Sequence, residues 1–200
     1  NDYFSRLELA YNLAPDRFSE DDVDYIEKQF KNADLTFNRD LEAGGRNVAV
    51  GYSALQTYNA SGNSYNVAIG YAAGQLVTTG TENTLIGGLA GDALTDADLN
   101  VAVGSQALSS DTKGSANTAI GRAAMQENTT ASNNTAVGYA ALIANTTGEA
   151  NVAVGAIALD ANTTANANTA IGYASLSATT TGASNTAVGA YTLDANTTGT

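Results

Sequence analysis

The chain contains no cysteine, no histidine and no tryptophan among its 200 residues. Without cysteine it can form neither a disulfide framework nor a thiolate metal site. Without histidine it also lacks the base of Ser–His and Cys–His catalysis and the usual nitrogen ligand of zinc. An enzyme that works with carboxylates alone remains open, but we expect a protein that is not an enzyme and that uses no cofactor or metal.

Basic residues are scarce as well, because eight Lys and Arg stand against twenty Asp and Glu, for a net charge of −12. Phosphate binding needs clustered Lys and Arg, so we expect neither nucleic acid nor an anionic membrane surface as a partner. No apolar run approaches the ~18 residues that a bilayer requires, so we expect no membrane span.

The composition changes near residue 46. Residues 1–46 hold all four Phe, the only Pro and six of the eight basic residues. The rest of the chain is rich in Ala, Gly, Asn, Thr and Val, with sparse charge. We therefore expect two parts, an N-terminal segment over 1–45 and a second domain over 46–200.

The second domain repeats the pattern Asn-Thr/Val-Ala-Val/Ile-Gly nine times, with one Leu in place of Ala. Successive copies are 17 residues apart, except that the first step is 19. A fixed period of this size is typical of stacked architectures. We number the positions of each copy from its Asn. The copies begin at Asn47, Asn66, Asn83, Asn100, Asn117, Asn134, Asn151, Asn168 and Asn185.

Positions 2 to 4 predict a short strand, because Thr and Val suit strands and side chains alternate between faces. Position 4 is always β-branched and apolar, so we assign it to the core: Val50, Ile69, Ile86, Val103, Ile120, Val137, Val154, Ile171 and Val188. Position 9 is usually Leu and is also assigned to the core, as in Leu142, Leu159, Leu176 and Leu193. Gly74 and Gly91 break this rule, and we expect Leu76 and Leu94 to fill the space.

Position 5 is Gly in every copy, which predicts a corner that needs a positive φ or leaves no room for a Cβ. The corner glycines are Gly51, Gly70, Gly87, Gly104, Gly121, Gly138, Gly155, Gly172 and Gly189. A second short strand and an Asn-Thr-Thr-Gly turn would complete each coil.

These features predict an all-β fold, a parallel β-solenoid or β-roll of about nine coils. Coils stacked at ~4.8 Å would form a rod about 40 Å long. One coil alone buries too little apolar surface to offset the conformational entropy lost when its residues are ordered, so the coils must stabilise one another. Alanine on the second face of the strand invites close approach by another surface, and we expect a homo-oligomer, a trimer. A monomeric solenoid is the alternative.

The segment from Asn134 to Gly148 resembles repeats in fibre proteins of bacterial viruses and related surface proteins. Val67-Ala-Ile-Gly70 is similar to the core pattern in the left-handed β-roll heads of trimeric autotransporter adhesins. The resemblance covers residues 47–200 and implies trimeric parallel β-rolls on a virion or cell surface. The 17-residue period departs from those heads, which commonly use shorter repeats.

The N-terminal segment contains one expected helix. Ser19-Glu-Asp-Asp22 is similar to a capping box, and Val23, Ile26 and Phe30 follow on one apolar stripe. We expect a helix over about 20–33. It could dock the fibre to a capsid, tail or envelope structure, or it could cap the open edge of the first coil.

Asp92, Asp96 and Asp98 form the densest acidic cluster of the repeats. A calcium site is one interpretation, but the spacing fits no EF-hand loop and no Gly-Gly-x-Gly-x-Asp repeat, so we favour a solvated turn. The same cluster is the candidate for carboxylate catalysis.

Three further patterns have both a functional and a structural interpretation, and in each we favour the structural one. Asn128-Thr-Thr130 and its counterparts match the glycosylation sequon, which repetition explains without glycans. Regular threonine pairs could bind ice, but a ladder within the turn is favoured: 129–130, 146–147, 163–164, 180–181 and 197–198. Tyrosines after the corner could stack on sugars, but packing is favoured: Tyr52, Tyr71, Tyr139 and Tyr173.

We therefore expect a structural fibre protein, a trimeric shaft on a virion docked through its N-terminus. The alternative is the head of a bacterial surface adhesin whose solenoid binds host or matrix ligands, such as a host-surface receptor. A third hypothesis, from another class, is a glycan-active enzyme on a solenoid scaffold.

Overall fold

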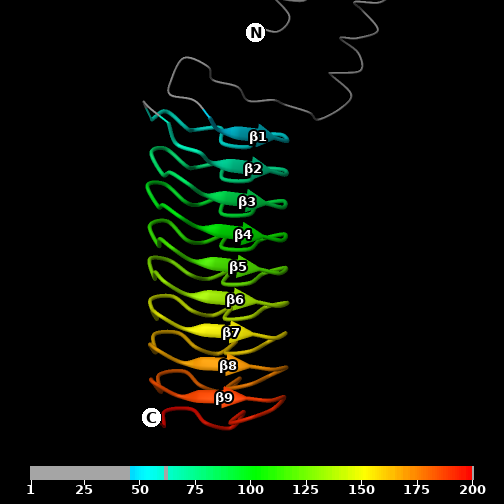
Figure 1. The fold of residues 1–200 in the computed structure, drawn as a ribbon, viewed down its shortest axis with the longest axis vertical. Coiled ribbons are helices and arrows are strands. Elements are labelled where there is room, and N and C mark those ends of the chain that lie inside the picture. The colour runs from blue at the N-terminus through cyan, green and yellow to red at the C-terminus, as the bar shows by residue number, and fades with distance from the viewer. Residues whose placement is uncertain (1–45, 61–62, 200) are drawn as a thin grey trace, which may run out of the picture. The chain divides into compact units, whose positions relative to one another are not determined.

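The computed structural model describes residues 46–60 and 63–199, which form a parallel β-solenoid (Figure 1). Nine three-residue strands form one sheet in chain order, and no helix occurs in these two ranges. The expected solenoid is confirmed. The strands are β1 Val48–Val50, β2 Val67–Ile69, β3 Thr84–Ile86, β4 Val101–Val103, β5 Thr118–Ile120, β6 Thr135–Val137, β7 Val152–Val154, β8 Thr169–Ile171 and β9 Thr186–Val188.

The expectations for residues 1–45 lie outside the described residues. They comprise the helix over 20–33 and its docking residues Val23, Ile26 and Phe30.

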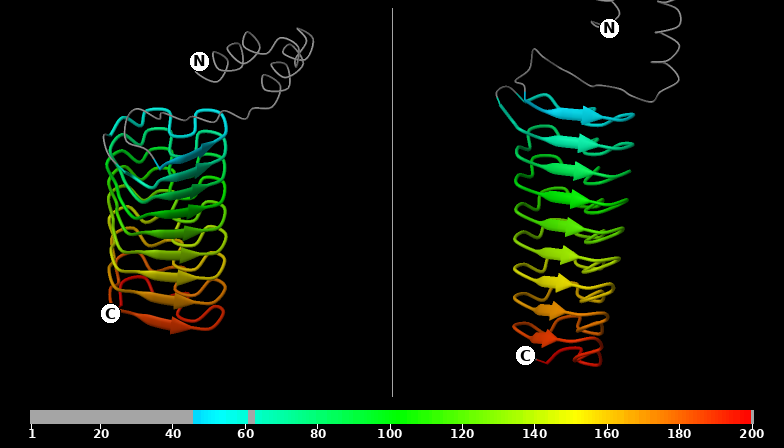
Figure 2. Two further views of the ribbon diagram at one scale, coloured as in Figure 1. Left: turned by 45° about the horizontal axis from the view of Figure 1, so that its top comes forward. Right: turned by 45° about the vertical axis from the view of Figure 1, so that its right-hand side comes forward.

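Every strand pairs in parallel with the next, and equivalent positions lie opposite one another (Figure 2). Ala136 of β6, for example, pairs with Ala153 of β7. The 19-residue step between β1 and β2 keeps this register, since Ala49 still pairs with Ala68. The insertion is therefore absorbed outside the strands, and like residues form columns along the rod.

The strand turns its small central residue inward, which contradicts the assignment of position 4 to the core. Ala68 and Ala170 are fully buried, whereas Ile69 and Ile171 are 38% and 40% exposed. The interior is already filled by the small residue of position 8 and by Leu or Met of position 9, so it accepts only alanine from most strands. The nine residues wrongly assigned to this core face outward: Val50, Ile69, Ile86, Val103, Ile120, Val137, Val154, Ile171 and Val188.

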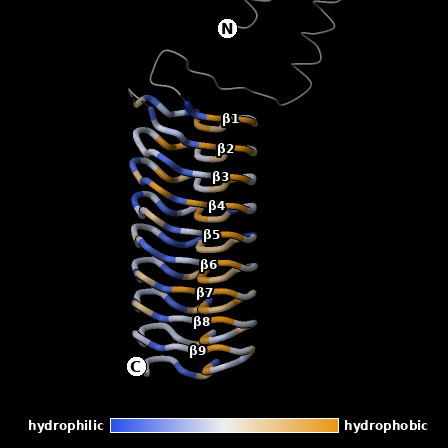
Figure 3. The backbone as a smooth tube through the Cα atoms, viewed as in Figure 1, coloured by the Kyte–Doolittle hydropathy of each residue, from blue (hydrophilic) through white to orange (hydrophobic). Residues whose placement is uncertain are grey.

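Leucine at position 9 is in the interior, as predicted. Leu142, Leu159 and Leu176 are fully buried. Leu193 is 48% exposed because it lies in the last described coil. Figure 3 shows the resulting pattern, in which hydrophobic residues recur at each strand and hydrophilic residues lie along the opposite edge of the rod.

The expected second strand is absent from the described coils, and a turn takes its place. Positions 7 and 9 have positive φ, as at Ala140 (53°) and Leu142 (53°), so the backbone cannot extend there. A left-handed conformation costs an L-residue roughly 1–2 kcal/mol, which the burial of leucine at position 9 can offset.

Two coils depart from the usual interior. Gly74 and Gly91 stand at position 9, and Leu85 replaces the central alanine of β3. A Cβ added at Gly74 would lie 2.7 Å from Leu85 Cδ1, and one added at Gly91 would lie 2.8 Å from Leu85 Cδ2. Leu85 therefore occupies the space of two leucines. Leu94 is fully buried, as expected, but Leu76 is 46% exposed, so that part of the prediction is wrong.

Candidate functional site

The corner glycines are confirmed as a steric requirement. All nine have φ between 125° and 141°. A Cβ at Gly138 would lie 2.5 Å from the carbonyl oxygen of Gly155 in the next coil, which is closer than real Cβ atoms approach. The same contact recurs from Gly51 to Gly172. These glycines allow successive coils to stack, so their role is structural.

The asparagines of position 1 form a buried amide ladder along the rod. Each backbone N–H donates to the side-chain oxygen of the preceding asparagine, as from Asn151 to Asn134 Oδ1 at 2.9 Å. From Asn66 to Asn185, each side-chain nitrogen donates to a carbonyl of its own coil's last turn, as from Asn151 Nδ2 to Ala165 O at 2.8 Å. The ladder ties every coil both to itself and to its neighbour.

A second amide ladder, which the sequence analysis described only as part of a turn, occupies position 12. Asn145 Nδ2 donates to Asn128 Oδ1 at 2.9 Å, and Asn162 Nδ2 donates to Asn145 Oδ1 at 2.9 Å. All three residues are fully buried. These sequon asparagines therefore cannot be glycosylated in the folded coils, which supports the structural interpretation.

Asp111 stands where this second ladder begins. Its carboxylate is fully buried and accepts hydrogen bonds from the Gly114 and Lys113 N–H groups and from Asn128 Nδ2. Burial raises the pKa of the Asp111 carboxyl above its ordinary value of 3.8, although these donors act in the opposite direction.

Position 13 is threonine in the eight coils from Thr78 to Thr197, and its hydroxyl is used inside the rod. Thr129 Oγ1 donates to Thr146 O at 2.9 Å, and Thr146 Oγ1 donates to Thr163 O at 3.0 Å. Only the second threonine of a pair, such as Thr147, is fully on the surface. A single exposed column favours a turn ladder over an ice-binding plane.

The acidic cluster is not brought together as a metal site. No group of three potential ligands occurs in the described ranges. Asp98 Oδ1 accepts from the backbone and hydroxyl of Thr81 in the preceding coil, and Asp96 Oδ1 accepts from Thr95 Oγ1. Asp92 lies on a different part of the coil, where burial raises the pKa of its carboxyl. Asp96 is exposed and Asp98 is half-buried, as the solvated-turn interpretation requires, but Asp92 Oδ1 is buried without a hydrogen-bond partner and does not fit that interpretation.

The outward side of the sheet is uncovered in the described coils. We call positions 2 and 4 of β1–β9 the outer face. Position 4 is always Val or Ile, and position 2 is Val or Thr. No charged residue lies on this face, and its columns run the full height of the sheet. Several of its side chains are more than a third exposed: Val48, Ile69, Ile86, Ile120, Ile171 and Val188.

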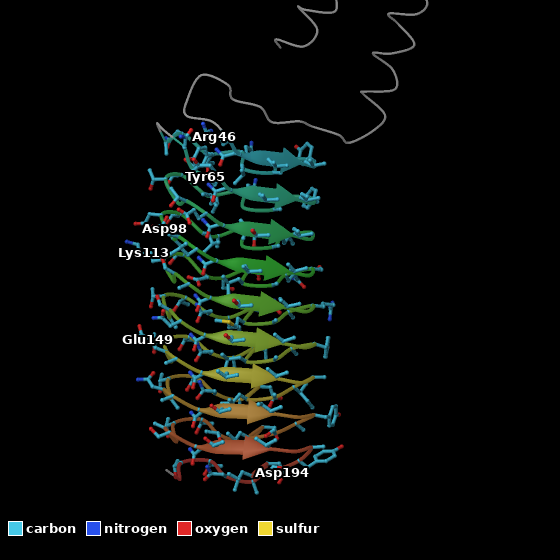
Figure 4. The ribbon with its side chains drawn as sticks, viewed as in Figure 1. Arg46, Tyr65, Asp98, Lys113, Glu149 and Asp194 are labelled. Carbon is cyan, nitrogen blue, oxygen red and sulfur yellow. The ribbon has the colours of Figure 1, made fainter. Side chains whose placement is uncertain are left out.

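Two columns flank the outer face. We call position 17, just before each Asn, the leading margin, and position 6, just after the corner glycine, the trailing margin. Among the described residues, charge on the margins is confined to Arg46, Glu82 and Arg122. Figure 4 shows Asp98, Lys113 and Glu149 along the left edge of the rod, which we call the turn edge, on the side away from the arrowheads of the strands.

The exposed tyrosines of the trailing margin pack along the rod. Tyr52 and Tyr71 stack with ring centroids 5.7 Å apart and an interplanar angle of 9°. Arg122 lies over the Tyr139 ring at 5.8 Å, and Tyr173 meets Tyr191 edge-on at 5.3 Å. These contacts support packing along the rod surface over sugar stacking.

Comparisons with known proteins leave the chain to be interpreted from its own geometry. No family model, no curated protein and no solved structure matches it. Within the described ranges, no helix has the length and apolar character needed to cross a membrane.

Proposed function

We propose that this protein is a structural fibre component, a stiff shaft in which three copies of the solenoid associate through their outer faces. The shaft belongs to a virion appendage and docks to it through residues 1–45. The resemblance of the repeats to those of viral fibres supports this assignment. The proposal names no reaction and no cofactor.

The observation that carries the proposal is the uncovered outer face. Parallel sheets are normally covered on both sides, and here the inner side is packed while the outer side presents Val and Ile in register. The outer face together with its two margins is roughly 20 Å wide and ~40 Å tall, an area on the order of 800 Å². Each partner in a stable protein interface contributes about this much.

The hydrogen bonds of the rod support the proposed stiffness. Backbone groups of each strand bond to the strand in the next coil, and the amide and threonine ladders add side-chain bonds in the same direction. Bending or stretching such a rod would require the hydrogen bonds of all these columns to break together. A shaft needs this property, whereas a catalytic scaffold has no particular need of it.

The mass of the full chain in solution tests the proposed association. The unaltered protein is expected to have three times the chain mass at micromolar concentration. A charge on the outer face, in the double variant Ile120→Glu and Val137→Glu, should give a folded monomer. The control, Thr130→Glu with Thr147→Glu, adds the same charge on the turn edge and should leave the trimer intact. A clean monomer for the unaltered chain would sink the proposed trimer.

A bacterial adhesin head is the second candidate, favoured by the Val67–Gly70 pattern. Immunogold microscopy distinguishes the two by labelling purified virus particles or the surface of intact cells. For a virion fibre, Ile26→Asp with Phe30→Asp should release the shaft from particles while its trimer mass is unchanged. Retention of that variant on particles would contradict docking through these residues.

A further inference from the structure

One backbone hydrogen bond between successive coils is missing at two junctions of the described rod. We name each junction by the strands of its two coils. The N–H of position 11 usually donates to the position 10 carbonyl of the next coil, as from Ser110 N to Gln126 O at 3.0 Å. The donors at the complete junctions are Thr57, Leu76, Ser110, Glu127, Ala144 and Ala178. Among the described residues, Ala93 and Ala161 make no such bond, so the β3/β4 and β7/β8 junctions lack it.

The upper coil of each incomplete junction has aspartate at position 10. These residues are Asp92 and Asp160, whereas position 10 is Gln, Ser or Ile in the upper coil of every complete junction. A short carboxylate competes for nearby backbone N–H groups that would otherwise join a hydrogen-bonded ladder. The Asp160 carboxylate accepts a hydrogen bond from the Ala161 N–H, which is the donor missing from the β7/β8 junction.

Both junctions also leave polar atoms unpaired. Asp92 Oδ1 and Asp160 Oδ1 are shielded from water and form no hydrogen bond in the described structure. Within the same ranges, the carbonyls of Ser109 and Ser177, at position 10 of the next coils, accept no hydrogen bond either. A protonated carboxyl has an O–H donor, and each of these carbonyls lies one coil away from it, about 4.8 Å along the rod.

We propose that Asp92 and Asp160 form two proton-sensitive joints in the rod. While the carboxylate is charged, the two coils share one backbone bond fewer and a shielded oxygen is unpaired, so the joint opens more readily. When a proton binds, the shielded charge disappears and the new O–H bonds to the next coil, so the joint tightens. The two joints are four coils apart, about 19 Å along the axis.

No other charged side chain adjoins these carboxyls in positions 10 and 11 of the described neighbouring coils. The residues there are Gln75, Leu76, Ser109 and Ser110 around Asp92, and Ile143, Ala144, Ser177 and Ala178 around Asp160. The nearest carboxylates in these columns, Glu127 and Asp194, are two coils away, about 10 Å. Burial raises the pKa of both carboxyls above the ordinary value of 3.8, although backbone N–H groups act in the opposite direction.

Amide hydrogen exchange of the full chain measures how readily each junction opens. The Thr95 N–H crosses the β3/β4 junction to Thr112 O, and the Thr112 N–H crosses the β4/β5 junction to Thr129 O. At neutral pH, Thr95 should be protected about fivefold less than Thr112, which corresponds to one net hydrogen bond.

The dependence of this protection on pH tests the role of the proton. A raised pKa makes the joint tightest below pH 3.8 and loosens it as the pH rises through the raised value. After correction for intrinsic exchange rates, the difference between Thr95 and Thr112 should therefore shrink as the pH falls from 7 to 4. A difference that does not change over this range would overturn the proton sensitivity.

Asparagine in place of either aspartate supplies a permanent N–H donor and removes the titration. Asp92→Asn should raise the protection of Thr95 about fivefold at neutral pH, and Asp160→Asn should do the same for Thr163 at the β7/β8 junction. Neither variant should retain a pH dependence at its junction. Unchanged exchange in both variants would rule out joints at these residues.

The converse variant tests whether aspartate alone creates a joint. Serine follows both natural aspartates at position 10 of the next coil, but Gln126 is followed by Ile143. Gln126→Asp should lower the protection of the Thr129 N–H about fivefold at neutral pH and leave it nearly unchanged at pH 4. The matched control, Gln126→Glu, adds the same charge on a longer side chain and should leave the junction closed. Equal loosening by both variants would refute capture of the neighbouring N–H as the cause.

These measurements concern junctions inside one chain, so their outcome is separate from that of the proposed association. A monomeric chain with two proton-sensitive junctions would defeat the trimer and support the joints. A trimer in which all junctions exchange alike would support the fibre and defeat the joints.

Discussion

The coils that begin with β2 and β3 and the coils that begin with β5 to β8 enclose the same interior with different residues. In the first group, position 9 is glycine and position 12 is an apolar residue, Val77 or Leu94. In the second group, position 9 is Leu or Met, and position 12 is usually asparagine. The backbone follows one path in both groups, since the strands keep one register throughout.

The difference shows that a residue must fit the equivalent residues in the coils above and below it, and not only the other residues of its own coil. Leu85 fills the space vacated at Gly74 in the coil above it as well as at Gly91 in its own. In the buried ladder, Asn128 Oδ1 and Asn145 Oδ1 accept from the amide of the next coil, whereas Asn162 Oδ1, which Thr179 follows, has no partner. A substitution should therefore be judged against the coils on either side of it.

The largest effect is expected where both groups are identical, at the corner glycine. Gly138→Val should lower the free energy of unfolding by about 4 kcal/mol, because it combines a φ of 141° with a clash against Gly155 O. Thermal or urea unfolding measures the loss. Gly88→Ala is the matched control, since its Cβ meets nothing within 4 Å, and it should change stability by less than ~0.5 kcal/mol. Equal losses from both would show that the corner is not a steric requirement.

The next largest effect is expected from substitutions that convert a coil of the first group into a coil of the second. Leu85→Ala should cost about 3 kcal/mol because it opens a cavity beside Gly91. Leucine is compatible with the backbone of Gly91, whose φ of 54° matches the 53° of Leu142. Gly91→Leu alone should also destabilise, because an added Cβ lies 2.8 Å from both Leu85 Cδ2 and Leu94 Cδ1. The double variant removes the overlap with Leu85 and keeps the one with Leu94, so it should recover part of the loss, and unfolding measurements on all four proteins should give a coupling of at least ~1 kcal/mol.

The features of single positions could be predicted from the sequence, and the features of columns could not. Repetition located the period, the corner glycines and the buried leucine of position 9. Alternation grouped position 2 with position 4, but it could not tell which side of the strand faces inward. That depended on the width of the interior, which Leu142 and its equivalents had already filled. The left-handed leucines escaped prediction because leucine has no intrinsic preference for that conformation.

The outer face illustrates the same limit in the candidate site. The sequence predicted the surface for a partner copy on the alanine side of the strand, whereas the structure leaves the Val and Ile side uncovered. The margins gave no sequence signal, because their residues vary from copy to copy.

A smaller, stabilising effect is expected where the second amide ladder stops. Asn162 Oδ1 is buried and has no hydrogen-bond partner, because the next coil has Thr179 at position 12. Thr179→Asn should supply the missing N–H and raise the free energy of unfolding by about 1 kcal/mol. The control, Thr181→Asn, adds the same side chain on the surface and should have no effect. A loss of stability from Thr179→Asn would show that the ladder cannot be extended.

The smallest expected effect concerns the other end of that ladder and depends on pH. Burial raises the pKa of Asp111, so the folded protein holds this proton more tightly than the unfolded chain does. Its contribution to stability is therefore largest below the ordinary pKa of 3.8 and falls as the pH rises through the raised value. Asp111→Asn removes this titration and continues the ladder as Asn128 does. The free energy of unfolding of the variant, relative to that of the unaltered protein, should rise between pH 4 and neutrality and then stay constant. Urea unfolding across that range measures the difference, with exposed Asp194→Asn as the control. A difference that stays constant with pH would mean that the Asp111 carboxyl titrates alike in the folded and unfolded chain.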